Sequence, residues 1–159
     1  MGRYALVTDW RLAAPIEQVW DALFDVATWP RWWKYVLAVQ EIEPGNANGV
    51  GAVRRYTWGS RLPYQLSFNM RATIVKRPHV LAGDAVGELT GTGRWTLSAS
   101  AATTQVRYDW DVATSRPWMN ALAPLLAPAF KWNHGQVMAA GGRGLARYLG
   151  AELTALTGP

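Results

Sequence analysis

The chain has 159 residues, of which 50% are hydrophobic and 17% charged; this composition excludes a disordered chain and predicts a single domain over residues 1–159. Sixteen Lys and Arg against eleven Asp and Glu give a net charge of +5, but the arginines are scattered, so we expect no nucleic-acid partner. With no cysteine in the chain, disulfides and thiolate metal sites are excluded.

The hydropathy pattern does not indicate a membrane protein. The first ten residues lack the apolar run of a signal peptide, and no apolar stretch approaches the roughly 20 residues of a membrane helix. We therefore predict a cytoplasmic protein without stable membrane insertion. The basic charge would suit an anionic ligand or a membrane surface, but a solvated sheet face is the favoured explanation.

Tryptophan is the unusual component, with ten copies in the chain. Indole rings are large, and a buried one usually needs a hydrogen-bond partner for its N–H group. Ten of them predict either a heavily aromatic core or an aromatic-lined pocket.

The N-terminal part predicts one strand followed by two short helices. Residues 4–12 alternate between apolar and polar side chains, which is typical of a half-buried strand. Pro15 suits the first turn of a helix, and apolar residues at helical spacing continue to about residue 24. A second short helix is predicted from Pro30, and the three tryptophans within residues 29–33 are expected to form a hydrophobic plug.

Six further strands are predicted, separated by turn-forming residues. The clearest alternation assigns one face of a strand to the interior and the other to water, as in an antiparallel sheet. Its interior set is Tyr64, Leu66, Phe68, Met70, Ala72 and Ile74. The predicted strands are residues 35–43, 50–58, 63–76, 79–87, 89–99 and 104–113.

The C-terminal part predicts one long helix over residues 129–155. Residues 118–128 are apolar, but Pro124 and Pro128 limit any helix there to a short or kinked one. Glycines inside the long helix each cost about 1 kcal/mol relative to alanine. Either an indole or a strand packs against them, or they widen a cavity. These glycines are Gly135, Gly141, Gly142 and Gly144.

Three parts of the chain form a recognisable set of motifs: residues 14–23 (APIEQVWDAL), residues 29–33 (WPRWW) and a C-terminal group. That group consists of His134, Val137, Met138, Gly141, Gly144, Leu145 and Leu149. With these motifs the chain resembles the START-like (SRPBCC) superfamily, in particular its polyketide cyclase/dehydrase and lipid-transport branch.

The resemblance implies an α+β helix-grip fold. A curved antiparallel sheet of about seven strands would wrap around the long C-terminal helix, with two short helices after the first strand. It also implies an apolar cavity between sheet and helix, in a superfamily that binds lipids, sterols or polyketides and includes some cyclases. A fold alone does not choose among these functions.

His134 is the candidate catalytic residue. Its spacing places it on the same helix face as Phe130 and Met138, so it would face the cavity and could act as general acid or base. The alternative is a packed histidine held by one hydrogen bond. His79, after Pro78, is expected in a surface turn.

No cofactor or metal is predicted. The two histidines are far apart, and no carboxylates cluster at a ligand spacing. Arg54 shares a strand face with Tyr56 and Trp58, so it could meet an anionic group of a ligand. The predicted ligand-binding residues are Arg54, Tyr56, Trp58, Tyr64, Phe68, Met70, Trp95, Tyr108, Trp110, His134 and Met138.

Three hypotheses for the function follow. The first is binding of a hydrophobic, ring-containing small molecule or lipid, for which we expect a cavity of several hundred cubic ångströms. The second is a cyclase or dehydratase that uses His134 for proton transfer, with a second polar group in hydrogen-bonding reach. The third is an interaction module whose core the tryptophans fill. A homodimer is left open.

Overall fold

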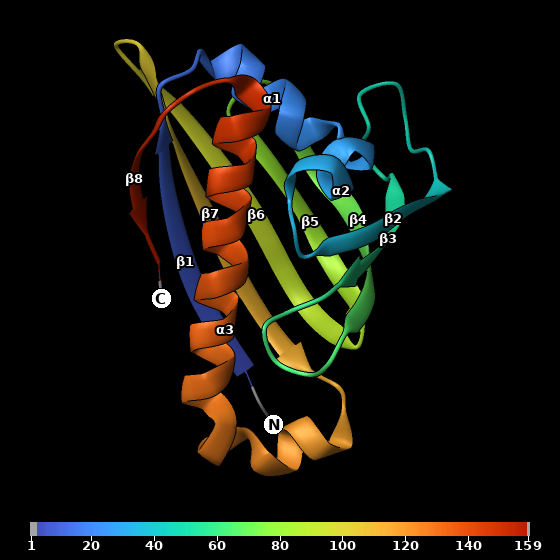
Figure 1. Cartoon of the computed structure of the whole chain (residues 1–159). Helices are drawn as coiled ribbons and strands as arrows, with labels where there is room; N and C mark the ends of the chain where they lie inside the picture. The colour runs from blue at the N-terminus through green and yellow to red at the C-terminus, as the bar shows by residue number, and fades with distance from the viewer. Residues whose placement is uncertain (1–2, 159) are drawn as a thin grey trace.

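The computed structural model describes residues 3–158, which form one curved antiparallel sheet and a long helix on its concave face (Figure 1). Within this range the sheet has eight strands in the order β2-β3-β4-β5-β6-β7-β1-β8. The elements are β1 (Arg3–Leu12), α1 (Ile16–Phe24), η1 (Val26–Thr28), α2 (Trp29–Trp32), β2 (Val36–Glu43), β3 (Val53–Trp58), β4 (Leu66–Lys76), β5 (Val80–Gly87), β6 (Leu89–Ser100), β7 (Thr103–Thr114), α3 (Pro117–Leu149) and β8 (Leu153–Thr157).

The predicted α+β helix-grip fold is confirmed. β1 illustrates how the alternating pattern builds it: Leu6, Thr8, Trp10 and Leu12 are buried, whereas the residues between them are more exposed. Because side chains of a strand point alternately to its two faces, one face of the sheet covers the core. In Figure 1, α1 and α2 lie on the same side of the sheet as α3, near the C-terminal end of that helix.

Helix α3 differs from the prediction at both ends. It begins at Pro117 and includes Pro124 and Pro128, and its first turns run at a steep angle to the rest (Figure 1). Proline removes a backbone donor and bends a helix, so this segment is the kinked helix that the sequence allowed, and it is continuous with the long helix.

The predicted end of the helix at residue 155 was wrong. Gly150 adopts a left-handed conformation (φ 62°), and its N–H donates to the carbonyl of Ala146, which is a common way for a helix to end. The chain then turns into β8, which pairs with β1. Leu153 and Leu156 of β8 pack against the core, and this extra strand raises the count from about seven to eight.

Two details of β4 also differ. The strand starts at Leu66 instead of residue 63, so Tyr64 lies in the preceding loop. A bulge between Ala72 and Ile74 shifts the register with β5. A bulge inserts one extra residue and so reverses the faces beyond it. Consequently Val75 packs against the core, where the alternation had placed Ile74.

Three glycines of α3 are in close contact with tryptophan residues. This confirms, for these three, the prediction that an indole or a strand packs against the helix backbone. A Cβ on Gly141 would lie 2.7 Å from Cζ2 of Trp33, and one on Gly142 would lie 3.0 Å from Nε1 of Trp10. At Gly144 a Cβ would overlap the carbonyl oxygen of Trp32. The plug of residues 29–33 therefore packs directly on the α3 backbone.

Candidate functional site

A cavity of about 190 Å³ lies between the sheet and α3. It is smaller than the several hundred cubic ångströms that we predicted, and Trp29 and Trp33 of the plug are among its lining residues. Tryptophans thus line the cavity. All eleven predicted ligand-binding residues are among its lining side chains: Arg54, Tyr56, Trp58, Tyr64, Phe68, Met70, Trp95, Tyr108, Trp110, His134 and Met138.

The sheet side of the cavity is a continuous aromatic wall. The rings of Trp95 and Tyr108 stack with centroids 4.1 Å apart, and Tyr108 stacks on Trp110 at 5.7 Å. Tyr56 and Phe68 stack at 6.3 Å on the neighbouring strands. Cross-strand and same-face neighbours in a sheet stand side by side, so these rings form a continuous apolar surface along the sheet side of the cavity, against which another ring can pack.

The aromatic wall includes two tyrosines, Tyr56 and Tyr108. Burial raises the pKa of both Tyr56 and Tyr108, so both hydroxyls stay protonated at neutral pH. Gly93 makes room for Tyr108, since a Cβ there would lie 2.6 Å from the Tyr108 hydroxyl oxygen. Arg54 lines the same cavity and is in no ion pair within residues 3–158. These groups can donate hydrogen bonds, and Arg54 adds a positive charge.

His134 faces the cavity from α3. Its Nε2 atom is buried and has no hydrogen-bond partner among the described residues, so the single bond expected of a packed histidine is not found there. Burial lowers the pKa of the ring to about 4, and the imidazole is therefore neutral at pH 7. A neutral imidazole accepts a proton or a hydrogen bond, but it does not supply a proton at that pH.

Three buried polar atoms on the cavity lining lack a partner within residues 3–158. They are the hydroxyl of Tyr4, the indole nitrogen of Trp58 and Nε2 of His134. A buried polar atom without a hydrogen bond costs about 1–3 kcal/mol, and native proteins contain few of them. Their collection around one apolar cavity marks the positions at which a bound molecule would find hydrogen bonds.

Asn133 is a cavity residue that the sequence analysis missed. Its Oδ1 accepts a hydrogen bond from the backbone N–H of Arg61 at 3.1 Å, and its Nδ2 donates to the Tyr64 hydroxyl at 3.3 Å. Asn133 is buried, and these bonds attach the loop of residues 59–65 to α3. The signal was a polar residue three positions after Phe130, on the buried side of the helix.

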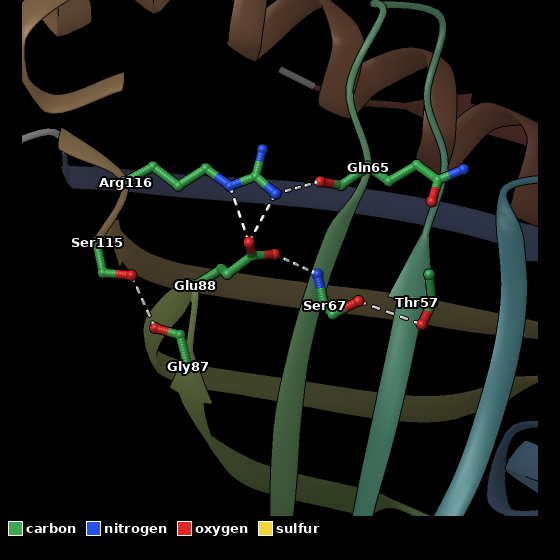
Figure 2. Close-up of polar contacts among 7 residues, drawn as sticks. All are labelled: Thr57, Gln65, Ser67, Gly87, Glu88, Ser115 and Arg116. Carbon is green, nitrogen blue, oxygen red and sulfur yellow. Dashed lines mark hydrogen bonds and ion pairs between the residues drawn. The ribbon is translucent and has the colours of Figure 1, made fainter. Parts of the chain in front are cut away.

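A second polar cluster fixes the same loop from its other end (Figure 2). The Glu88 carboxylate accepts hydrogen bonds from the Ser67 backbone N–H at 2.6 Å and from Nε of Arg116 at 2.9 Å. Arg116 also donates to the carbonyl of Gln65 at 2.8 Å. Burial would raise the pKa of Glu88, but the bond from Ser67 and the charge of Arg116 outweigh it and lower that pKa.

These contacts join the β5–β6 turn, the beginning of β4 and the beginning of α3. They therefore hold the loop of residues 59–65 beside the cavity.

Comparison with solved structures shows the same fold in proteins of low sequence identity. The Zhui aromatase/cyclase from Streptomyces sp. R1128 superposes with a TM-score of 0.76 at 17% identity, covering 93% of this chain and 94% of that one. A protein from Thermus thermophilus gives a TM-score of 0.73 at 12% identity, covering 91% of this chain and 99% of that one.

The di-domain ARO/CYC BexL from the BE-7585A biosynthetic pathway gives 0.71 at 16% identity, with 94% of this chain covering 51% of that one. No curated protein matches the sequence. No helix within residues 3–158 is long and apolar enough to span a membrane.

The family model described as polyketide cyclase/dehydrase and lipid transport matches residues 6–150. This range runs from within β1 to the end of α3 and so includes all of the cavity-lining residues except Tyr4. The chain therefore belongs to this family, within the SRPBCC superfamily.

Proposed function

We propose that the protein binds a hydrophobic, ring-containing small molecule in the cavity between the sheet and α3. The observation that carries this proposal is the combination of an aromatic wall with three buried polar atoms that lack partners. A flat ring would pack against the aromatic wall. Hydroxyl or carbonyl groups on that ring would form hydrogen bonds with the Tyr4 hydroxyl, the Trp58 indole nitrogen and Nε2 of His134. Arg54 adds a preference for a ligand with an anionic or strongly polar group.

The size of the cavity narrows the ligand class. A water molecule needs about 10–15 Å³ of such space, so a cavity of about 190 Å³ holds on the order of a dozen water-sized groups. This suits one or two fused rings with their substituents. A long acyl chain requires the tryptophan plug or the loop of residues 59–65 to move.

The test is to identify what co-purifies with the protein and then to obstruct the cavity. Native mass spectrometry followed by solvent extraction identifies a retained molecule. Naphthol then serves as a two-ring probe, with tryptophan fluorescence reporting its binding. The variant Ala72→Leu adds side-chain volume to the cavity lining, whereas Ala5→Leu adds the same atoms at an exposed position of β1.

We expect Ala72→Leu to weaken naphthol binding at least roughly tenfold, since well-packed sites tolerate added methylenes poorly, and Ala5→Leu to leave it unchanged. Equal binding by both variants would show that the probe binds elsewhere, and the cavity proposal would then be abandoned. Circular dichroism of both variants confirms that each is folded.

A second candidate is a cyclase or dehydratase of polyketide-like substrates with His134 as general base. The position of His134 supports it, because the residue lines the cavity and its buried Nε2 atom has no partner among the described residues and is unprotonated at pH 7, so it can accept a proton from an acidic carbon between two carbonyls. The lowered pKa makes this ring a weaker base than an exposed imidazole. Among residues 3–158 His134 has no hydrogen bond to a second polar side chain, so the substrate would have to orient it. With a β-polyketone substrate, His134→Gln should retain binding and abolish turnover; unchanged turnover would remove His134 from the reaction.

A further inference from the structure

The first half of α3 exposes a row of large apolar side chains. Trp118, Leu122, Leu125 and Trp132 are 44, 45, 77 and 48% exposed. The spacings of four and three residues place Trp118, Leu122 and Leu125 on one side of the first turns of α3, and Trp132 follows one turn after Pro128. Four of the nine exposed large hydrophobic residues within 3–158 therefore lie in this one segment, which we call the apolar ridge.

The opposite side of the same segment closes the cavity. Met119 and Phe130 are buried and line it, and Asn133 attaches the segment to the loop of residues 59–65. Figure 1 shows these turns at the end of the molecule away from α1 and α2. A molecule or surface that covers the apolar ridge is thus separated from the cavity by the thickness of one helix.

Three charges near the ridge that are in no ion pair among the described residues are all positive. Helix α3 contains no Asp or Glu over residues 117–149, although it includes Lys131 beside Trp132. The Arg61 guanidinium lies over the Trp132 ring at 5.7 Å, and Lys34 lines the same surface hollow as Trp118. Within residues 3–158 none of these three cations is in an ion pair. The ridge therefore has a basic and uncompensated border.

We propose that the apolar ridge is the site at which the protein binds the surface of an anionic lipid bilayer. An apolar helix face with tryptophans and a basic border is the arrangement that lies in the interface of such a membrane, and indole rings favour the headgroup level. Anionic lipids attract each nearby Lys or Arg. A protein partner or a second copy would explain the apolar side chains, but it would not require a border of a single charge.

Vesicle co-sedimentation tests this proposal with the full chain. Vesicles of phosphatidylcholine containing about one third phosphatidylglycerol are compared with vesicles of phosphatidylcholine alone, at low and high salt. We expect binding to the anionic vesicles that weakens with salt, because screening reduces surface attraction. Leu125→Glu should reduce this binding at least roughly tenfold. It removes an apolar side chain that the lipid would bury, and it adds a negative charge that the anionic lipids repel.

Val86→Glu is the matched control, because Val86 is 63% exposed on β5, outside the ridge. It carries the same charge change and should bind almost as well as the wild type. Both variants alter exposed positions, and equal midpoints of thermal unfolding confirm that they remain folded.

A second readout locates the contact. Of the ten tryptophans, all within the described residues, only Trp118 and Trp132 belong to the exposed class. Brominated lipids should therefore quench part of the fluorescence, and the double variant Trp118→Phe/Trp132→Phe should abolish this quenching.

Absence of binding to anionic vesicles overturns the proposal, and so does equal loss of binding in Leu125→Glu and Val86→Glu. A concentration-dependent mass doubling in light scattering that Leu125→Glu abolishes would assign the ridge to a second copy instead. None of these readouts depends on naphthol binding, so failure here leaves the proposed cavity function untouched.

Discussion

The indole ring of Trp33 lies directly against the backbone of Gly141, and its Nε1–H donates a hydrogen bond of 2.8 Å to the carbonyl of Val137, one turn earlier in α3. This contact joins the tryptophan plug to the helix that closes the cavity. Both Trp33 and Val137 also line the cavity. The shape of the site and the packing of the fold therefore depend on the same absent side chain at residue 141.

Gly141→Ala tests this contact. Alanine favours a helix by about 1 kcal/mol over glycine, but the added Cβ would come within 2.7 Å of Trp33 Cζ2. Overpacking costs about 1–3 kcal/mol, so we expect a net loss of about 1 kcal/mol in the free energy of unfolding, measured in urea. In a Trp33→Leu background the same substitution should cost less, since the obstructing ring is gone. An equal cost in both backgrounds would place the strain elsewhere.

The pH dependence of stability should carry the signature of His134. Its pKa in the folded protein is about 4, below the usual 6.5, so the unfolded chain takes up the proton first. The contribution of His134 to the free energy of unfolding is therefore fully present above about pH 6.5 and is lost progressively as the pH is lowered towards 4. At about 1.4 kcal/mol per pH unit, the wild type should lose about 2 kcal/mol between pH 7.5 and pH 5 through this residue.

Urea unfolding of the wild type and His134→Gln at these two pH values measures the effect. The variant should lose less stability than the wild type on acidification. The chain has two histidines, so the His134 ring signal in NMR can be assigned by its disappearance in the variant. A His134 signal that titrates near pH 6.5 would contradict the prediction.

Glu88→Gln should loosen the cluster of Figure 2. The carboxylate accepts bonds from Ser67 and Arg116, and its side chain is 34% exposed. Because solvent weakens such a pair, we expect a loss of about 1 kcal/mol at neutral pH. The lowered pKa means that this stabilisation persists until the pH falls below about 4.5 and is then lost.

Glu43→Gln provides the control for this measurement. Glu43 and Arg71 form an ion pair of 3.6 Å in which both side chains are more than half exposed. Exposed pairs contribute about 0–1 kcal/mol, so this variant should unfold close to the wild type. Equal effects of the two substitutions would argue that the Glu88 cluster contributes no more than an ordinary surface pair.

Asn133→Ala should free the loop of residues 59–65. The Asn133 side chain accepts a hydrogen bond from the Arg61 backbone N–H and donates one to the Tyr64 hydroxyl, which attaches the loop to α3. Loss of one partner of a buried hydrogen bond costs about 1–3 kcal/mol. Hydrogen exchange in this loop should accelerate, with little change in β6 and β7. Gln136→Ala, one turn further along α3, is the control and should leave exchange in the loop as it is. Unchanged exchange in Asn133→Ala would mean that other contacts hold the loop.

Much of the architecture was predictable because local patterns decide it. The alternation of residues 4–12 and 89–99 marks strands whatever they pair with, since side chains of a strand alternate between two faces. The same alternation identified Tyr56, Phe68, Trp95 and Tyr108 as interior residues, and they line the cavity. That any of them binds a ligand stays a prediction.

Other features followed only from the tertiary structure. The bulge that brings Val75 inward arises from the pairing of β4 with β5, and residues 153–157 became a strand because β1 offered a free edge. Each of these outcomes depends on a partner that is distant in sequence.

By itself the sequence determined the element types, the polar and apolar faces and the aromatic character of the interior, because spacing and side-chain chemistry are local properties. Only the tertiary structure decided how much of the interior the tryptophans fill, which buried polar atoms lack a partner, and that Asn133 and Glu88 hold the loop of residues 59–65. Cavity volume and hydrogen-bond partnership arise where distant segments meet, so no local pattern records them.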